Sequence, residues 1–415
     1  MFSILFICFL LSDIGLRLWL ATRQLHHVRQ HRDRVPAAFA ERISLRSHQR
    51  AADYTAGLTR LAMVERVVEA MVLVGFTLLG GLQWLDLHLG QLIDHELSRQ
   101  LALIAAVLVI TGVIGLPFTL WRKFVLDERF GFNRMSLGLF FADSAKALFL
   151  VLLFGTPLAA SVLWIMGNAG PWWVVPAWLV WVGFRLLILW LFPSVIAPMF
   201  NRFTPLAQPE LRERIESLAQ RCDFALDGLF VMDGSRRSAH GNAYFTGIGR
   251  QRRIVFFDTL LARLNVDEIE AVLAHELGHY KQHHLLVRSV VDAVLALAFL
   301  LGLAWLSGQV WFYTGLGVIP QLARPNDGLA LLLFFMTLPV FTFWLTPVLA
   351  WRSRRDEYAA DRYAVTHSSG PALASALIKL YDDNAATLTP DPLHSAFYDS
   401  HPPAVARLEA IAHAR

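Results

Sequence analysis

Two histidines stand four residues apart in the segment His275-Glu276-Leu277-Gly278-His279, which has the pattern HExxH. On an α-helix this spacing places both imidazoles on one face, about 6 Å apart along the axis. Two imidazole nitrogens in that arrangement can share one zinc ion, and a glutamate beside the metal can take a proton from water. The pattern therefore predicts a hydrolytic zinc site with His275 and His279 as ligands and Glu276 as general base.

A catalytic zinc ion needs at least one more protein ligand. The segment 353–361 offers candidates, because Glu357 and Asp361 are four residues apart and share a helix face. Glu357 can supply the third ligand, and Asp361 can accept a hydrogen bond from the far nitrogen of a metal-bound imidazole. Asp356 is also eligible by its spacing, and a solvated face paired with neighbouring arginines is an alternative for the whole segment. The residues alone leave this choice open.

The composition places the chain in a membrane. Of its 415 residues, 55% are hydrophobic and 17% are charged, whereas soluble proteins carry about 25% charged residues. A helix that crosses ~30 Å of hydrocarbon needs about 20 mostly apolar residues. Seven segments meet this need: Phe2–Leu20, Met63–Leu85, Leu101–Leu120, Ala147–Met166, Trp172–Phe192, Val290–Leu306 and Leu329–Ala350.

Positive charge alternates between successive loops. The loops after the first and third segments carry clusters of arginine, whereas the loops after the second, fourth and sixth segments carry one or none. Because arginine and lysine collect on the cytoplasmic side, this pattern predicts an outside N-terminus and a cytoplasmic C-terminus. The net charge of +4 fits a basic cytoplasmic face and requires no nucleic-acid partner. Arginine far outnumbers lysine, which hints at a bacterial genome and hence an inner membrane.

The same pattern divides the chain into four regions. Residues 1–193 form a first membrane region with five helices, and residues 194–289 form the first part of a catalytic region. Residues 290–350 contain two further membrane helices, and residues 351–415 contain the second part of the catalytic region. Both catalytic parts are expected in the cytoplasm.

Several separated segments, taken in order, are similar to those of one protein family. Besides His275–His279 and Ser353–Asp361 they are Leu126–Asn133 with Asp143 and Lys146, Ile196–Leu206, Ser238–Gly247 and Ser400–Pro403. These segments resemble the type I CAAX prenyl endopeptidases, which are seven-span zinc metallopeptidases. The resemblance runs from about residue 117 to the C-terminus. It implies a mainly α-helical, polytopic fold and a gluzincin-like cytoplasmic domain with a small β-sheet.

The resemblance also implies the residues of a metal site. One zinc ion per chain is held by His275, His279 and Glu357, with Glu276 as the general base and Asp361 as an acid that orients a ligand. The implied substrate is a peptide or protein, membrane-associated or lipidated, that is cleaved near the bilayer.

Three further catalytic residues follow from the resemblance. Asn242 and His401 match residues that stabilise the oxyanion, and Arg407 matches an arginine near the site. Chemistry agrees, because hydrogen-bond donors are needed where negative charge develops on the former carbonyl oxygen. By residue type alone, Asn242 would be a turn residue and His401 an ordinary loop histidine.

Three short runs before HExxH have the composition of strands: Leu226–Met232, Asn242–Thr246 and Arg253–Phe257. A small sheet leaves an edge to which an extended peptide can add as another strand. The resemblance places that edge at Ala239, His240, Gly241, Asn242, Ala243, Tyr244 and Phe245, which are the predicted substrate-binding residues. A structural hairpin that covers the active-site helix is an alternative compatible with the same role.

Charged residues also fall within or near the apolar segments. They are Asp13 and Arg17, Glu65 and Glu69, and Arg185 and Asp292. Such groups usually face a protein interior or a water-filled cavity, and the family resemblance implies a hydrated chamber. Mutual neutralisation or snorkelling to the interface is the alternative for the first two pairs.

Two other functions compete with this interpretation. The chain could be a broad quality-control protease of the HtpX kind, although those proteins have fewer spans. It could also be a transporter or channel with a structural zinc ion. Structural zinc sites normally close their coordination with four protein ligands, whereas three ligands plus a glutamate base favour catalysis.

Overall fold

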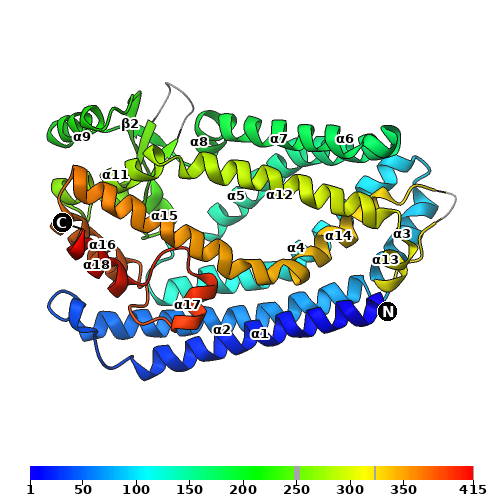
Figure 1. The fold of residues 1–415 in the computed structure, drawn as a ribbon, viewed down its shortest axis with the longest axis horizontal. Helices are drawn as coiled ribbons and strands as arrows, with labels where there is room; N and C mark the ends of the chain where they lie inside the picture. The colour runs from blue at the N-terminus through cyan, green and yellow to red at the C-terminus, as the bar shows by residue number, and fades with distance from the viewer. Residues whose placement is uncertain (247–252, 322–323, 415) are drawn as a thin grey trace.

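The computed structural model describes residues 1–246, 253–321 and 324–414. Most of this chain is helical, and the longest helices run along one axis of an elongated molecule (Figure 1). The helices of the membrane part are α1 (Phe2–Gln30), α2 (Leu45–Phe76), α3 (Gly81–Leu92), α4 (Glu96–Trp121), α5 (Leu137–Leu150), α6 (Thr156–Asn168), α7 (Val174–Leu191), α8 (Ala197–Phe200), α12 (His284–Ser307), α13 (Val310–Gly315), α14 (Asp327–Thr342) and α15 (Thr346–His367). Three π-helical turns continue α4, α5 and α7: Arg122–Asp127, Val151–Gly155 and Phe192–Ile196.

Within the described residues, six helical segments are long and apolar enough to cross a membrane. Each contains one of the predicted spans, namely the first and the third to the seventh. They are Phe2–Gln30, Glu96–Asp127, Leu137–Asn168, Gly170–Phe200, His284–Ser307 and Asp327–His367. The chain is therefore an integral membrane protein with several spans.

The second predicted span, Met63–Leu85, is not one continuous helix. Helix α2 ends at Phe76, and α3 begins after Gly80, whose φ of 77° is a left-handed conformation that glycine adopts at little cost. Charged residues at 65, 66 and 69 also lower the apolar character of α2. Helix α2 is not among the six segments, although it packs along α1 over much of its length (Figure 1). A seventh crossing therefore stays a prediction.

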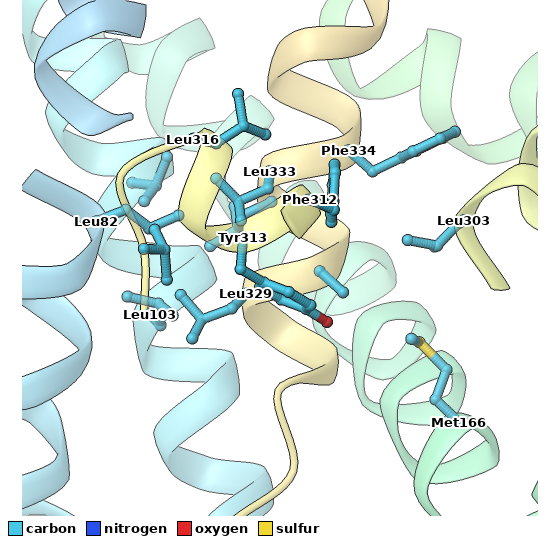
Figure 2. Packing of buried hydrophobic residues seen from close by; sticks show 14 of the residues in the cluster. Leu82, Leu103, Met166, Leu303, Phe312, Tyr313, Leu316, Leu329, Leu333 and Phe334 are labelled. Atoms are coloured by element: carbon cyan, nitrogen blue, oxygen red, sulfur yellow. The ribbon is translucent and has the colours of Figure 1, made fainter. Parts of the chain in front are cut away.

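The apolar core of the membrane part includes a group of buried side chains from α3, α4, α13 and α14. Leu82, Leu103, Phe312, Leu329 and Leu333 are at most 2% exposed and converge there (Figure 2). Helices α3 and α13 lie at the end of the molecule far from α11 (Val266–Lys281), which carries HExxH (Figure 1). This packing fixes the bundle at one end and leaves the other end for the site.

The catalytic region contains a small mixed sheet and short helices. The strands are β1 (Phe203–Pro205), β2 (Gly228–Met232), β3 (Ala243–Thr246) and β4 (Arg253–Phe257), in the order β1-β2-β4-β3. Strands β2 and β4 are parallel, and the other neighbours are antiparallel. The three predicted strands are thus present, and β3 lies at an edge. The remaining helices are α9 (Pro209–Arg221), α10 (Asp258–Leu261), α16 (Gly370–Asp383), α17 (Pro392–Tyr398) and α18 (Ala404–His413).

The charged residues in the membrane part both pair and line cavities. Asp13 and Arg17 are 2.7 Å apart and border a cavity of about 360 Å³, which Glu65 and Glu69 also line. Arg185 and Asp292 are 3.1 Å apart in the wall of a second cavity, of about 830 Å³. Neutralisation and exposure to a cavity therefore occur together.

Candidate metal centre

Helix α11 holds the HExxH segment in a buried position. It begins with a capping box, in which the Asn265 side chain accepts a hydrogen bond from Glu268 N and the Glu268 carboxylate accepts one from Asn265 N, each 2.9 Å. One turn apart on its inner face, His275 and His279 direct their Nε2 atoms at each other across 3.2 Å. The helical spacing read from the sequence is therefore realised.

Helix α15 brings the third candidate ligand to this pair. Glu357 Oε1 lies 3.3 Å from His279 Nε2, and Glu357 Oε2 lies 3.6 Å from His275 Nε2. One ligand atom from each of the three residues lies within 4.8 Å of the others. The helices approach so closely because Gly278 faces α15, where an added Cβ would lie 3.0 Å from the Ala360 Cα atom.

Asp361 and Arg407 form a buried support behind His275. Asp361 Oδ1 is 2.8 Å from His275 Nδ1, and Arg407 binds both oxygens of Asp361 at 2.7 and 2.8 Å. Asp361 and Arg407 are 2% and 5% exposed. Because Nδ1 of His275 donates to this carboxylate, Nε2 keeps its lone pair for a metal. The structure thus brings together both residues that the family resemblance placed near the site.

Glu276 lines the same cavity as the three candidate ligands. This cavity has a volume of about 530 Å³, and Ser400 and His401 form part of its wall. Burial raises the pKa of the Glu276 carboxyl, against the effect of the nearby imidazoles. Its side chain makes no hydrogen bond with any other described residue. A carboxylate in this setting can exchange a proton with water in the cavity.

The two predicted oxyanion donors lie in different settings. His401 Nδ1 is 2.8 Å from Glu357 Oε2, so this imidazole contacts a candidate ligand directly, while 63% of its side chain stays exposed. Asn242 is exposed, and its Oδ1 atom accepts a hydrogen bond from Ala243 N at 2.8 Å. Asn242 is not among the described residues that line the metal cavity.

Only part of the predicted substrate-binding segment has an open edge. Ala239 N donates to Phe132 O at 3.1 Å, and Ser238 forms a bridge with Asn133. His240 stacks on the Phe132 ring and contacts Asn384 Oδ1 at 2.9 Å. The backbone of residue 239 is therefore already paired, because the segment after α4 returns to this point.

Strand β3 is the part of this segment that stays at the edge. It pairs with β4 from Ala243 opposite Phe256 to Thr246 opposite Arg253, and it contacts α11. Among the described residues no strand pairs with its other side. Gly241 and Asn242 lead into this strand, and Tyr244 and Phe245 lie within it.

His283 and His284 follow the HExxH segment in the sequence and are further candidates near the metal, although neither is predicted to be a ligand; the structure places His284 at the site. Its Nδ1 atom is 2.9 Å from His279 Nδ1, and its Nε2 atom is 3.6 Å from Asp356 Oδ1. The chain turns at His283, whose φ is 58°, and this left-handed residue brings His284, at the start of α12, against His279. Asp356, which spacing allowed as a ligand, instead faces His284. Only the turn creates this contact, so periodicity could not predict it.

The fold and the site together define a class, the membrane metallopeptidases. A family model described as "CAAX prenyl protease N-terminal, five membrane helices" matches residues 24–202, and one for peptidase family M48 matches residues 205–415. The chain therefore belongs to peptidase family M48 and is a membrane metalloendopeptidase of the CAAX prenyl protease type.

Similar proteins cover three quarters of the chain or more. CAAX prenyl protease 1 homolog of Oryza sativa subsp. japonica is 33% identical over 396 residues, which are 92% of this chain and 92% of that protein. CAAX prenyl protease 1 of Saccharomyces cerevisiae is 36% identical over 335 residues, 76% of this chain and 72% of that protein. The crystal structure of S. mikatae Ste24p matches with a TM-score of 0.92 at 27% identity, covering 100% of this chain and 99% of that one.

Proposed function

We propose that His275, His279 and Glu357 bind one zinc ion per chain and that Glu276 is the general base for peptide hydrolysis. The convergence of the three ligand atoms within 4.8 Å, beside an unpaired glutamate, carries this proposal. Two imidazole nitrogens and a carboxylate oxygen are a donor set of catalytic zinc sites. Glu357 Oε2 is buried, and the only groups near it are His401 Nδ1 at 2.8 Å, His275 Nε2 at 3.6 Å and Arg407 Nη2 at 3.4 Å among the described residues, so this oxygen lies in a setting that favours its negative charge.

Zinc bound there would polarise the peptide carbonyl and lower the pKa of water. Glu276 takes the proton from the attacking water and returns it to the leaving amine. His401, at the exposed wall of the cavity, and Asn242, at the start of β3, donate hydrogen bonds to the oxyanion. Asp361 and Arg407 hold the His275 ring in the orientation that binding requires.

The edge of β3 gives the substrate a place to bind. A peptide added beside residues 243–245 would be held by main-chain hydrogen bonds, which make few demands on its side chains. Residues 239–242 would contact the same peptide as it passes the turn before the strand. Support comes from the position of β3 at the sheet edge and its contact with the HExxH helix.

The substrate is proposed to be a membrane-associated or lipidated peptide or protein. The metal cavity is lined partly by apolar residues of α12 and α15, including Leu285, Val291 and Leu349, so it opens among membrane helices. The similar proteins are named CAAX prenyl proteases. The arginine pattern of the loops supports a cytoplasmic catalytic region, an outside N-terminus and α2 as a seventh crossing. The excess of arginine over lysine in the whole chain supports a bacterial inner membrane.

Purified protein in liposomes tests this function. A quenched fluorescent peptide should be cleaved, a zinc chelator should abolish cleavage, and added zinc should restore it, because removal of zinc removes the Lewis acid that would polarise the peptide carbonyl. Cleavage that resists complete removal of metal, or ion flux without cleavage, would contradict the proposal and favour the transporter alternative.

His284 is proposed to position His279. Its Nδ1 atom accepts a hydrogen bond from Nδ1 of His279, which leaves Nε2 of His279 free for the metal. We expect His284→Ala to weaken zinc affinity by roughly 10–100-fold, as removal of outer hydrogen bonds to ligands does. Competition with a chelator measures this affinity without reference to activity.

His283→Asn is the matched control for this experiment. Asparagine tolerates the left-handed backbone at 283, and the His283 side chain is exposed and makes no hydrogen bond with the described residues. The His283→Asn variant should bind zinc with the affinity of the wild type. Equal zinc affinity in His284→Ala and the wild type would show that His284 is not a positioning residue.

A further inference from the structure

A second pocket adjoins the metal cavity where α12 begins and α15 leaves the apolar part of its span. Its volume is about 390 Å³, and three arginines of α15 line it, Arg352, Arg355 and Arg362, together with Gln282 and Trp351. The two hollows share a wall formed by residues 284, 352 and 356. The pocket is thus basic and lies directly beside the site.

None of these three arginines has an acidic partner. Among the described residues, the guanidinium groups of Arg352, Arg355 and Arg362 make no hydrogen bond or ion pair, whereas that of Arg354 on the same helix donates to the carbonyl oxygens of residues 395 and 399. The pocket contains one carboxylate, Asp356, which faces His284. Three guanidinium groups around one hollow repel one another, so the pocket favours an anion.

The pocket lies at the level where the apolar surface ends. On the apolar side of the pocket, at the start of α12 and in the first turn of α15, Leu285, Leu286 and Val348 are 57–65% exposed, as expected for side chains in contact with lipid tails. Arg355 lies over the Trp351 ring, with its Cζ atom 5.0 Å from the centroid. Tryptophan and arginine at the end of an apolar helix mark the membrane interface.

The spacing of the first two arginines fits a headgroup layer. Arg352 and Arg355 are three residues apart, about 4.5 Å along the helix axis. Each headgroup layer of a bilayer is about 5–7 Å thick. Arg362 lies about 10 Å beyond Arg355 along the helix axis, outside a layer of that thickness, but it lines the same pocket, so its long side chain can reach a headgroup bound there.

We propose that this pocket binds the headgroup of an anionic phospholipid. Charge complementarity, the lipid-facing apolar surface below it and the interfacial tryptophan select this occupant. The bound lipid would hold the bilayer surface level with the metal cavity, because the two hollows share a wall. A substrate anchored in the same leaflet would then reach the site with little chain to extend.

Lipid retention measured by native mass spectrometry tests this inference on the full-length protein. The wild type should retain phosphatidylglycerol in preference to phosphatidylcholine. The variant R355Q/R362Q should bind phosphatidylglycerol roughly ten- to thirtyfold more weakly, because each arginine near the headgroups contributes on the order of fivefold. Neither Arg355 nor Arg362 lines the metal cavity, so zinc content should stay unchanged.

The matched control removes two charges elsewhere. Arg42 and Arg46 are exposed and make no ion pair with the described residues, so R42Q/R46Q should retain phosphatidylglycerol within about threefold of the wild type. R355K/R362K should recover most of the binding. Equal weakening by both glutamine pairs would overturn the proposal, as would unchanged binding in R355Q/R362Q. Displacement of the lipid by equimolar inorganic phosphate would also overturn it, since the pocket would then be a general anion site.

Discussion

Glu276→Gln is expected to lower peptide cleavage by roughly 10²–10⁴-fold while the metal content stays at the wild-type value. The magnitude is that of general acid–base catalysis by one positioned group. Glutamine keeps the shape of the side chain but cannot accept a proton from water. Glu276 is not among the three residues whose ligand atoms cluster, so its replacement leaves the metal site intact. Initial rates on the fluorescent peptide and elemental analysis together measure the two effects.

Glu216→Gln is the control for this prediction. Glu216 lies exposed on α9, and its side chain makes no hydrogen bond with the described residues. The Glu216→Gln variant should cleave the peptide at the wild-type rate. A Glu276→Gln protein that also cleaves at that rate would remove Glu276 from the reaction, and one that loses its metal would make Glu276 part of the metal site.

Glu357→Ala is expected to lose both metal and activity. The substitution removes one of three donors, so zinc affinity should fall by more than the roughly 10–100-fold that follows removal of an outer hydrogen bond. The fold should persist, because Arg407 keeps both of its contacts with Asp361. Elemental analysis after dialysis measures the metal, and thermal unfolding checks the fold.

Glu409→Ala serves as the matched control, because Glu409 lies exposed on α18, the helix that also carries Arg407. It should retain the wild-type metal content and activity. Full metal content in Glu357→Ala would mean that another group completes the coordination. Asp356 would then be the first alternative to test, as the sequence had left it open.

In the membrane part, the hydropathy pattern predicts most of the helices that are long enough to cross a bilayer. Six of seven predicted spans lie within helices of the required length. The second, Met63–Leu85, is divided between α2 and α3 by the turn at residues 77–80, which an average of hydropathy does not register, so a seventh crossing stays a prediction. The proposed division at residue 350 also falls inside α15, which continues from the membrane part to Glu357 without interruption.

In the catalytic region, the spacing of residues along the sequence predicts strands but not the contacts between distant segments. The three predicted strands are present, but β1 was not predicted, since it has only three residues. The pairing of residue 239 with Phe132 was not predicted either, because the two segments are more than a hundred residues apart. The role proposed for His284 depends on one left-handed residue, which leaves no signal in the periodicity.

By itself, the sequence determined the class of chemistry and the membrane setting of this protein. Helical geometry fixes the relation between residues four apart, and the length of an apolar run fixes whether it can cross a bilayer. Tertiary structure alone decided which carboxylate meets the imidazoles. Glu357 and Asp356 are neighbours in the chain, but the rotation of α15 against Gly278 turns one toward the histidine pair and the other toward His284. That rotation is set by the close packing of α11 against α15, and it cannot be predicted from the spacing of residues along either helix.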